Sequence, residues 1–528
     1  MTGAAMNSRT NTAPSAKGLE GWRVLVTALD LEQSEHRGIA VYSKNLLRAL
    51  RQAGAEVWLL TELAPAMGDM APISRSSRSN RLVFTARTLE GLESGWRPER
   101  YTGLRQRILS RLPLYGLSRK LQTIVSKLLP KTTYRNGDLQ AFDLQTLYDN
   151  PYLQSARLSY LHDVKGLICT RDIYVNSFLV AQQKHTRTIQ LATDGFDAFI
   201  TTAPLAIQSS KAAITVQTIH DLIPLEYART SDLARSFTRR LKACDQTSRL
   251  FVSRSTQDKY NSFILESQPH PGQGQDCVVT QPPSLRFAAD ACDFDASNNT
   301  LLVADETRKT AVKLKPLRYI LFNSSIEPRK NVLFVLKAFV ESGLEAEGIH
   351  LCITGKLKHD SYSDAVKTLV MAHSNVVLAG YVDEALKRQL FLNAMAVVSP
   401  SLVEGFGIPV LDAACLGMPV IASLSESHWE IQQLHDFAEH VLLCSTRETS
   451  DWASALRLIY GRLQRQRLET VTSHRSATQQ TTLVRRSSEL WLKELRQQRI
   501  ERYRRFQQRL EADFQNSICE LLLQSRSS

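Results

Sequence analysis

The chain has 528 residues, of which 43% are hydrophobic and 22% are charged, and its formal net charge is +13 at pH 7. This composition is typical of a globular protein large enough for two domains, and it excludes a collagen-like chain, a largely disordered chain and a small disulfide-stapled scaffold. No apolar run approaches the roughly 18 residues that a membrane-spanning helix needs. The eight cysteines show no C-x-x-C spacing, which predicts neither a zinc site nor a disulfide framework and favours a reducing, cytoplasmic location.

The first half of the chain alternates strands and helices. The apolar run at 23–31 predicts a buried strand, the leucines at 46–50 predict a helix, and residues 56–60 predict the next strand. This β-α-β unit implies a parallel sheet. Further strand-like runs lie at 196–204, 212–227 and 248–260, the last of them continuing into a helix. We predict a disordered tail over 1–21 without the apolar stretch of a signal peptide, a first domain over 22–290, and a polar linker over 291–316.

One segment of this half concentrates the positive charge. Residues 97–135 carry ten Lys or Arg against a single Glu, and leucines recur there at near-helical spacing. A basic amphipathic segment of this kind can lie on an anionic membrane surface, which would make the protein peripheral on the inner face of a membrane. A solvated helical face explains the same pattern, and both interpretations stay open. No nucleic-acid motif is present, so we expect no nucleic-acid partner.

A second series of strands and helices starts at residue 317. Strands and helices alternate through the runs 317–343, 349–356, 375–382, 384–401 and 418–423. We predict a second domain over 317–470 and, over 471–528, helices whose apolar side packs back onto the body, with a partner-binding or membrane role as the alternative. The fold class is therefore α/β, with two doubly wound, Rossmann-like domains. Ligands of such sheets bind beyond the carboxyl ends of the strands, here in the cleft between the domains.

The stretch 401–417, SLVEGFGIPVLDAACLG, begins where one of these strands ends. Pro409 suits the first position of a helix, so the residues from Glu404 to Gly407 predict a loop that feeds a helix N-terminus. The two glycines of that loop leave room for a ligand close to the backbone. Free amides and the positive end of the helix dipole favour a phosphate there. Asp412 is expected in the first turn of the helix, where compensation of the dipole alone would explain it.

Two carboxylates, Glu404 and Asp412, flank this phosphate position. They would repel a phosphate, but they can accept hydrogen bonds from neutral hydroxyls on either side of it. A nucleotide sugar has this layout, with ribose hydroxyls on one side of a diphosphate and hexose hydroxyls on the other. Arg329 and Lys330 follow the first strand of the second half and can supply cations for the diphosphate. A solvated surface explains each residue alone; their combination at one sheet edge predicts a nucleotide-sugar site.

Several of these stretches together resemble a known enzyme family. EGFGIPVLDA resembles the E-x7-E motif of the retaining glycosyltransferases with the GT-B fold, family four of that classification, also called glycosyltransferase group 1. SSIEPRKNVLFVLKAF resembles the family's phosphate loop, HRGIAVYSKNLLRAL its first loop and helix, and TIHDLIPLEY its His-Asp segment. The similarity is dense from about 317 to 425, thinner over 23–260, and essentially absent over 60–150 and after about 450.

The resemblance implies a donor site, residue by residue. The N-terminal domain is expected to bind the acceptor and the C-terminal domain most of the nucleotide sugar. Glu404 is expected to contact the transferred sugar and Asp412 the ribose. Arg329 and Lys330 are expected to hold the diphosphate and stabilise its leaving charge, while His220 orients the sugar and stabilises developing charge. The other expected contacts are Gly38 across the cleft, Tyr381 and Val382 beside the base, and the loop residues Gly405, Phe406, Gly407 and Ile408, the last three through their backbone amides.

The resemblance also implies the reaction. The family retains the anomeric configuration without a metal or a protein nucleophile, and the departing phosphate oxygen takes the acceptor's proton. We therefore expect transfer of a hexose (mannose-like, glucose-like or rhamnose-like) to a glycan or lipid-linked saccharide in polysaccharide biosynthesis, with no cofactor. The alternative is a catalytically silent nucleotide-sugar-binding or scaffolding protein of the same fold. Asp412 departs from the family's usual Glu, which leaves the sugar and the nucleotide open.

Overall fold

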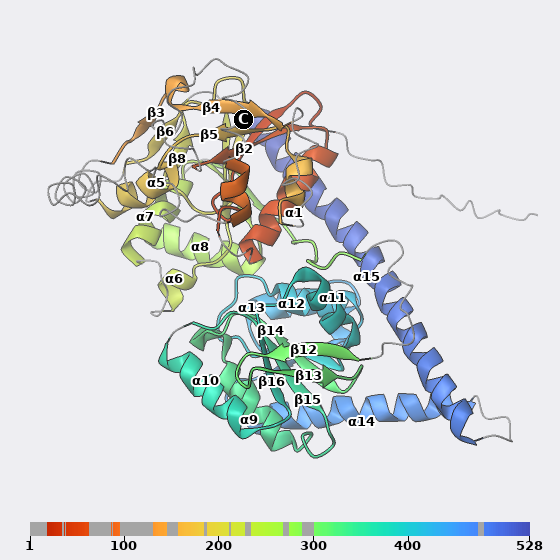
Figure 1. Cartoon of the computed structure of the whole chain (residues 1–528). Helices are drawn as coiled ribbons and strands as arrows, with labels where there is room; N and C mark the ends of the chain where they lie inside the picture. The colour runs from red at the N-terminus through yellow and green to blue at the C-terminus, as the bar shows by residue number, and fades with distance from the viewer. Residues whose placement is uncertain are drawn as a thin grey trace, which may run out of the picture.

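The computed structural model describes residues 18–33, 36, 38–62, 86, 88–94, 130–144, 157–183, 187–210, 213–227, 234–267, 274–287, 300–358, 360–473 and 480–527. These residues form two α/β domains and a long helix that runs along both of them (Figure 1). Most of the basic segment 97–135 lies outside the described residues, as does the predicted tail up to residue 17. Leu19 is fully buried and its amide donates to the Ala53 carbonyl, so the first domain already includes residues 18–21.

The first domain is built on a parallel sheet with the strand order β11-β10-β9-β7-β1-β2-β5-β4, in which only β4 runs antiparallel to its neighbour. Both faces of β1 and β2 are covered, which explains why these strands are nearly continuous apolar runs. The strands of this sheet are β1 Arg23–Thr27, β2 Glu56–Thr61, β4 Gln140–Asp143, β5 Gly166–Cys169, β7 Ala198–Thr201, β9 Ile214–Ile219, β10 Ser248–Phe251 and β11 Asp276–Val278. A smaller parallel sheet holds β3 Thr133–Tyr134, β6 Ile189–Leu191 and β8 Ile207–Ser209.

Helices pack against this sheet where the sequence predicts them. In α1 the leucines at 46, 47 and 50 are buried, and Gly54 follows the helix in a left-handed conformation with φ +96°. The α-helices of the first domain are α1 Gly38–Gln52, α5 Ile173–Gln182, α6 Ile223–Glu226, α7 Ala234–Cys244 and α8 Arg254–Ser267. Short 3-10 turns occupy Asn136–Asp138 and Ser159–Asp163.

The second domain has an all-parallel sheet with the order β16-β15-β14-β17-β18-β19. Numbered from the first strand of the domain, this is the doubly wound order 3-2-1-4-5-6, whose topological switch point lies between β14 and β17. Its strands are β14 Tyr319–Asn323, β15 His350–Thr354, β16 Val376–Gly380, β17 Ala396–Ser399, β18 Val420–Ser423 and β19 Val441–Cys444. Its helices are α9 Val332–Ser342, α10 Ser361–Ala372, α11 Glu384–Asn393, α12 Ile408–Cys415, α13 Glu426–Gln432 and α14 Thr449–Ser473, with 3-10 turns at Pro328–Lys330 and Phe437–Glu439. The expected class of two doubly wound α/β domains is confirmed.

The predicted linker 291–316 differs from the structure. Strands β12 Leu301–Asp305 and β13 Thr310–Leu314 form an antiparallel hairpin, and the amide of Glu306 in its turn donates to the Leu378 carbonyl of β16. Val303 and Leu314 are buried by this contact. Residues 300–316 therefore belong to the second domain, while 291–299 lie outside the described residues.

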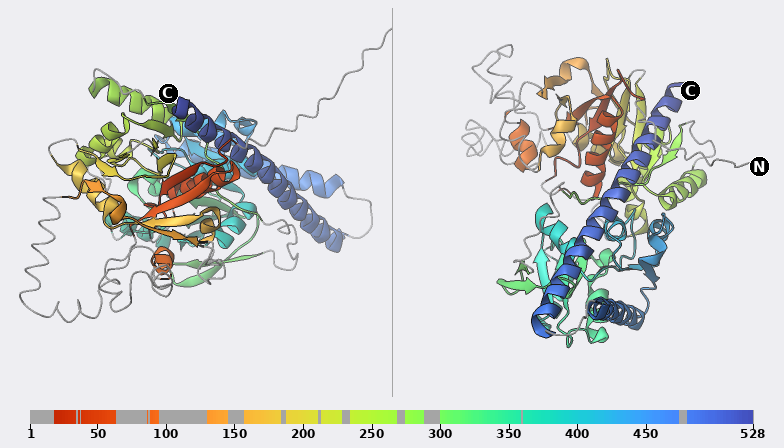
Figure 2. Two further views of the ribbon diagram at one scale, coloured as in Figure 1. Left: turned by 90° about the horizontal axis from the view of Figure 1, so that it is seen from above. Right: turned by 90° about the vertical axis from the view of Figure 1, so that its right-hand side faces the viewer.

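Helix α15 Gln480–Ser527 ties the two domains together (Figure 2). In the first half of the helix, Arg499 donates to the carbonyl oxygens of Leu392, in the last turn of α11, and of Ala394, just after that turn. Toward its end, Phe514 and Leu522 are buried in the core cluster that includes the first domain. The expectation that the C-terminal helices pack back onto the body is confirmed. Among the residues described, no helix is long and apolar enough to cross a membrane.

Candidate active site

The switch point of the second sheet brings two loops together. Strands β14 and β17 pair in parallel, so the turn Pro328–Lys330 after β14 lies beside the loop 400–407 after β17. From the first domain, the start of α1 and the segment after β9 face these loops. Together they line a cleft of about 380 Å³ between the domains.

This cleft gathers nearly all the site residues that the sequence predicts. The predicted residues that line it are Gly38, His220, Arg329, Lys330, Tyr381, Val382, Glu404, Gly405, Phe406, Gly407 and Ile408. They come from both domains and from five separate segments, which the chain brings together only on folding. Asp412 does not line the cleft.

A buried ion pair forms the centre of the site. The Lys330 ammonium, on a residue that is 6% exposed, donates to the Glu404 carboxylate, which also accepts a hydrogen bond from Ser401 Oγ at 3.0 Å. The Arg329 guanidinium lies 3.9 Å from the other carboxylate oxygen. Burial alone would raise the pKa of Glu404, but the charges of Lys330, His428 and Arg329 outweigh it and lower that pKa to about 2. Glu404 is therefore ionised at neutral pH and accepts hydrogen bonds without donating any.

Arg329 is held by a second carboxylate. Glu327 accepts a hydrogen bond from Arg329 Nε at 3.1 Å and pairs with Lys358 Nζ at 2.9 Å. Burial would raise the pKa of Glu327, but Lys358 and Arg329 outweigh it and lower that pKa. The turn Pro328–Lys330 thus presents its two cations from fixed positions, because each is paired with a carboxylate of the protein.

His220 is a neutral hydrogen-bonding group in this structure. Its Nε2 lies 2.8 Å from the Thr202 carbonyl oxygen, which can only accept, so Nε2 carries the hydrogen and Nδ1 is an acceptor. Burial lowers the pKa of His220 to about 4, although the bond to Thr202 acts in the opposite direction. The side chain can orient a sugar hydroxyl through Nδ1. The ring carries no positive charge at neutral pH, because desolvation favours its neutral form.

The glycines of the motif loop are required by contacts within the protein. A Cβ on Gly405 would lie 2.5 Å from the His220 carbonyl oxygen, so this glycine allows the two domains to touch. Gly407 has φ +104° and a Cβ there would lie 2.8 Å from the His428 ring. Both residues still line the cleft, beside the Ile408 amide at the start of α12, while the next amides of the helix donate to the Gly407 carbonyl oxygen.

Asp412 occupies a different position from the one predicted. It is the fifth residue of α12, beyond the first turn, and it is fully buried. Its Oδ1 accepts from the Ser284 amide at 2.6 Å and from the Tyr503 hydroxyl at 2.8 Å, and its Oδ2 accepts from Ser284 Oγ at 2.5 Å. Lys387 donates to the same Ser284 hydroxyl at 3.1 Å. The carboxylate therefore joins α12 to α15 and to the segment between the domains, and both its oxygens are engaged.

The structure adds residues to the site that the sequence analysis missed. The cleft is also lined by Gln281, Ser284, Glu384 and Lys387. Asp221, next to His220, lines it as well, and burial raises the pKa of its carboxyl. The Asp of the quoted TIHDLIPLEY segment could have signalled Asp221, whereas nothing in the sequence around Ser284 points to a site.

A cluster of three acids, the buried Glu32 and the half-buried Asp30 and Glu62, lies at the carboxyl edge of the first sheet, after β1 and β2. Burial raises the pKa of Asp30 and that of Glu62 to about 7. The pKa of Glu32 is raised well above its usual value by burial and by the charge of Glu62. Thr202 donates to Asp30 at 2.9 Å, and Thr61 donates to Glu32 at 2.6 Å. Low pH therefore favours the folded state here, because the neutral acids are easier to bury.

We expect Asp30→Asn to raise the thermal stability at about pH 8 and to leave it nearly unchanged at about pH 3.5, below the unfolded-state pKa. The pKa of Asp30 rises from 3.8 to about 7 on folding. The stability that this side chain contributes to the folded state is therefore fully present below pH 3.8, and it is lost as pH rises through about 7. At high pH the wild-type chain must bury a charge that Asn lacks, a difference on the order of 1–3 kcal/mol. Melting temperatures of both proteins across this range test it. An equal difference at both pH values would contradict it.

Two doubly wound domains that face each other across a cleft make the GT-B fold, and the cleft holds paired cations and carboxylates at the switch point. Residues 318–461 match the family model described as glycosyl transferases group 1. The match covers most of the second domain and confirms the resemblance at the level of group 1. Within the described ranges, no group of three or more His, Cys, Asp or Glu side chains is arranged to hold a metal.

Two relatives with curated descriptions and one solved structure are similar to the chain at 14–30% sequence identity. The serotype-specific mannosyltransferase WbdA of Escherichia coli is 24% identical over 247 residues, 45% of this chain and 29% of the relative. The O-antigen chain mannosyltransferase B of Escherichia coli is 30% identical over 110 residues, 20% of this chain and 28% of the relative. The chain thus spans less than a third of the length of these relatives. Sucrose-phosphate synthase from Thermosynechococcus elongatus aligns with 95% of this chain and 97% of its own at 14% identity and a TM-score of 0.47.

Proposed function

We propose that the chain transfers a hexose from a nucleotide-diphosphate sugar to a glycan or lipid-linked saccharide, with retention of configuration and without a metal. The observation that carries this proposal is the buried Lys330–Glu404 pair beside Arg329, at the switch point of a group 1 glycosyltransferase domain. The two E. coli relatives named above are mannosyltransferases, which favours a mannose-like sugar.

In this account the second domain holds the donor. Arg329 and Lys330 bind the diphosphate and stabilise the charge that develops on it as the sugar leaves. Glu404, already ionised, accepts hydrogen bonds from hydroxyls of the transferred hexose. The backbone amides of residues 406–408 add donors for the phosphates, and Tyr381 and Val382 border the base.

The first domain supplies the acceptor side. Neutral His220 accepts a hydrogen bond from a sugar hydroxyl through Nδ1 and fixes the orientation of the ring. The acceptor hydroxyl attacks the anomeric carbon from the face that the diphosphate leaves, and the departing phosphate oxygen takes its proton. Each bond that breaks is matched by one that forms, so the protein contributes positioning and charge stabilisation. A cytoplasmic location and a contact between segment 97–135 and an anionic membrane stay predictions.

The test compares wild type with Glu404→Gln on GDP-mannose, UDP-glucose and dTDP-rhamnose, with and without mannobiose as acceptor. We expect release of the nucleoside diphosphate from one donor, and a rate at least about 100-fold lower in the variant, because a positioned charge is lost from the reacting centre. Glu448→Gln, an exposed acid outside the cleft, is the matched control and should behave as wild type. Binding of a donor without release in the wild type would favour the catalytically silent alternative.

A further inference from the structure

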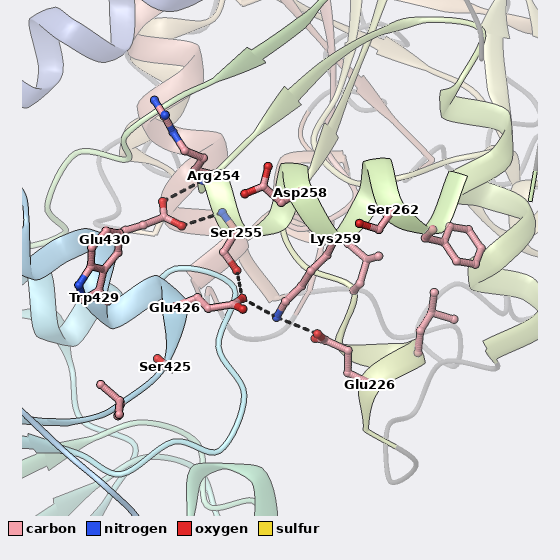
Figure 3. A pocket seen from close by; sticks show the side chains of 14 residues that line it. Glu226, Arg254, Ser255, Asp258, Lys259, Ser262, Ser425, Glu426, Trp429 and Glu430 are labelled. Atoms are coloured by element: carbon pink, nitrogen blue, oxygen red, sulfur yellow. Dashed lines mark hydrogen bonds and ion pairs between the residues drawn. The ribbon is translucent and has the colours of Figure 1, made fainter. Parts of the chain in front are cut away.

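A second, larger cavity lies between the domains and shares no lining residue with the donor cleft. Its volume is about 800 Å³, which lies within the range of ligand-binding pockets. The first domain lines it with α6 and α8, and the second domain lines it with α13 and the residues just before α13 (Figure 3). We call it the α8–α13 cavity.

Polar contacts hold the two walls of the α8–α13 cavity at a fixed spacing. Glu430 of α13 accepts from the amides of Arg254 and Ser255 at 2.8 and 2.7 Å, at the N-terminus of α8. Glu426 accepts from Ser255 Oγ at 2.6 Å and pairs with Lys259 at 3.3 Å. Lys259 in turn pairs with Glu226 of α6 at 2.7 Å, and this chain of contacts crosses the cavity in Figure 3. The cavity is therefore preformed, which lowers the entropy cost of filling it.

Several side chains that line the cavity expose apolar surface or polar groups that a ligand could contact. Trp429 is 53% exposed and Leu424 is 69% exposed, so both leave apolar area in water. Asp258 and Ser262 lie one turn apart on α8, and both are exposed. Within the part of the chain that the structure describes, neither side chain makes a hydrogen bond or an ion pair. The cavity thus offers an aromatic ring together with free hydrogen-bonding groups.

The charges of the cavity select against anionic ligands. Its lining carries four carboxylates, from Glu226, Asp258, Glu426 and Glu430, and two cations, from Arg254 and Lys259. A phosphate, a nucleotide or an anionic lipid headgroup would be repelled by this excess of negative charge. Carboxylates accept readily from neutral hydroxyls, and an indole ring packs against apolar C–H surfaces. A saccharide has both features and no charge.

We propose that the α8–α13 cavity binds saccharide units of the acceptor chain, at a distance from the hexose that is being transferred. The proposal rests on the proposed function, since a growing glycan extends beyond its reacting end. Trp429 packs on the face of one sugar ring, and Asp258 and Ser262 bind hydroxyls of neighbouring units farther along α8. The site makes the affinity for a long acceptor higher than the affinity for a short one, because two connected contacts bind together.

The test measures binding of mannotriose and maltotriose to the full-length protein by saturation-transfer NMR and tryptophan fluorescence, without any donor. We expect the wild type to bind at least one trisaccharide with a change in fluorescence. Trp429→Ala should weaken that binding about tenfold or more, because an aromatic contact with the sugar is lost. Asp258→Ala should also weaken it, because an acceptor for sugar hydroxyls is lost. Since Asp258 makes no hydrogen bond or ion pair within the described residues, this second variant should keep its fold. Met371→Ala, 56% exposed on α10, is the control and should bind as wild type.

The outcomes separate this inference from the proposed function. Equal trisaccharide affinity in Trp429→Ala and wild type, or no binding of either trisaccharide to the wild type, overturns the saccharide site even if donor turnover is found. Trisaccharide binding that depends on Trp429 supports the site. If no donor is turned over in that case, the transferase proposal fails and the saccharide site stands. Tighter binding of inorganic pyrophosphate than of a trisaccharide in this cavity would also overturn it.

Discussion

Lys330→Met lowers the affinity for a nucleoside diphosphate by about 10- to 100-fold, as measured by calorimetric titration. The loss has two causes. A charge-assisted hydrogen bond to phosphate is worth about 1.5–3 kcal/mol, and Glu404, no longer neutralised, repels the diphosphate. Lys337→Met, an exposed lysine on α9, is the matched control and should leave the affinity unchanged.

The same variant also tests the buried pair. Removing Lys330 leaves the Glu404 carboxylate buried with Arg329 3.9 Å away as its remaining cation, so the free energy of unfolding should fall by about 3–5 kcal/mol. The double variant Lys330→Met, Glu404→Gln should recover much of that stability without recovering nucleotide affinity, because no charge is then buried unpaired. Wild-type affinity in Lys330→Met would remove the diphosphate role from this lysine.

Asp412→Ala lowers the free energy of unfolding by about 3–5 kcal/mol, as measured by chemical denaturation. The substitution leaves the Ser284 amide, the Ser284 hydroxyl and the Tyr503 hydroxyl without their acceptor in a buried place. Tyr503→Phe removes one of these bonds and should cost about 1–3 kcal/mol. Asp364→Ala, on a carboxylate whose side chain is 71% exposed, is the control and should stay within about 0.5 kcal/mol of wild type.

This variant separates two roles of the second acid of the motif. The resemblance assigns it to the ribose of the donor, whereas here its oxygens are engaged by Ser284 and Tyr503. Unchanged stability in Asp412→Ala together with a large loss of nucleotide affinity would support the ribose role and contradict the structural one. A loss of stability with nucleotide affinity preserved would place the ribose contact elsewhere on the cleft, where Glu384 and Lys387 are exposed to it.

The sequence predicts the second domain closely because its strands are short apolar runs buried on both faces. The pairing of β14 with β17 then follows from the doubly wound order, and it explains why Lys330 and Glu404 meet although 74 residues separate them. The hairpin β12–β13 is missed because it buries little more than Val303 and Leu314 and follows an acidic, Asn-rich stretch.

Other features of the site depend on contacts that a linear sequence does not show. The partners of Asp412 lie 128 and 91 residues away, in the segment between the domains and in α15. The neutral state of His220 follows from its burial against Thr202, which the His-Asp motif alone does not indicate. From the sequence, Gly405 suggests room for a ligand, whereas in the structure the close approach of the His220 carbonyl oxygen is what requires a glycine there.

The central claim is that this cleft binds a pyrophosphate through Arg329 and Lys330. Thermal unfolding of the wild-type chain with GDP, UDP and dTDP, each beside its parent nucleoside, tests it most directly. We predict that at least one nucleoside diphosphate raises the melting temperature, whereas its parent nucleoside does not. At a concentration of 100 times its Kd, the diphosphate should stabilise the folded state by about 2.7 kcal/mol. Equal shifts from nucleoside and diphosphate, or no shift from any diphosphate, would contradict it.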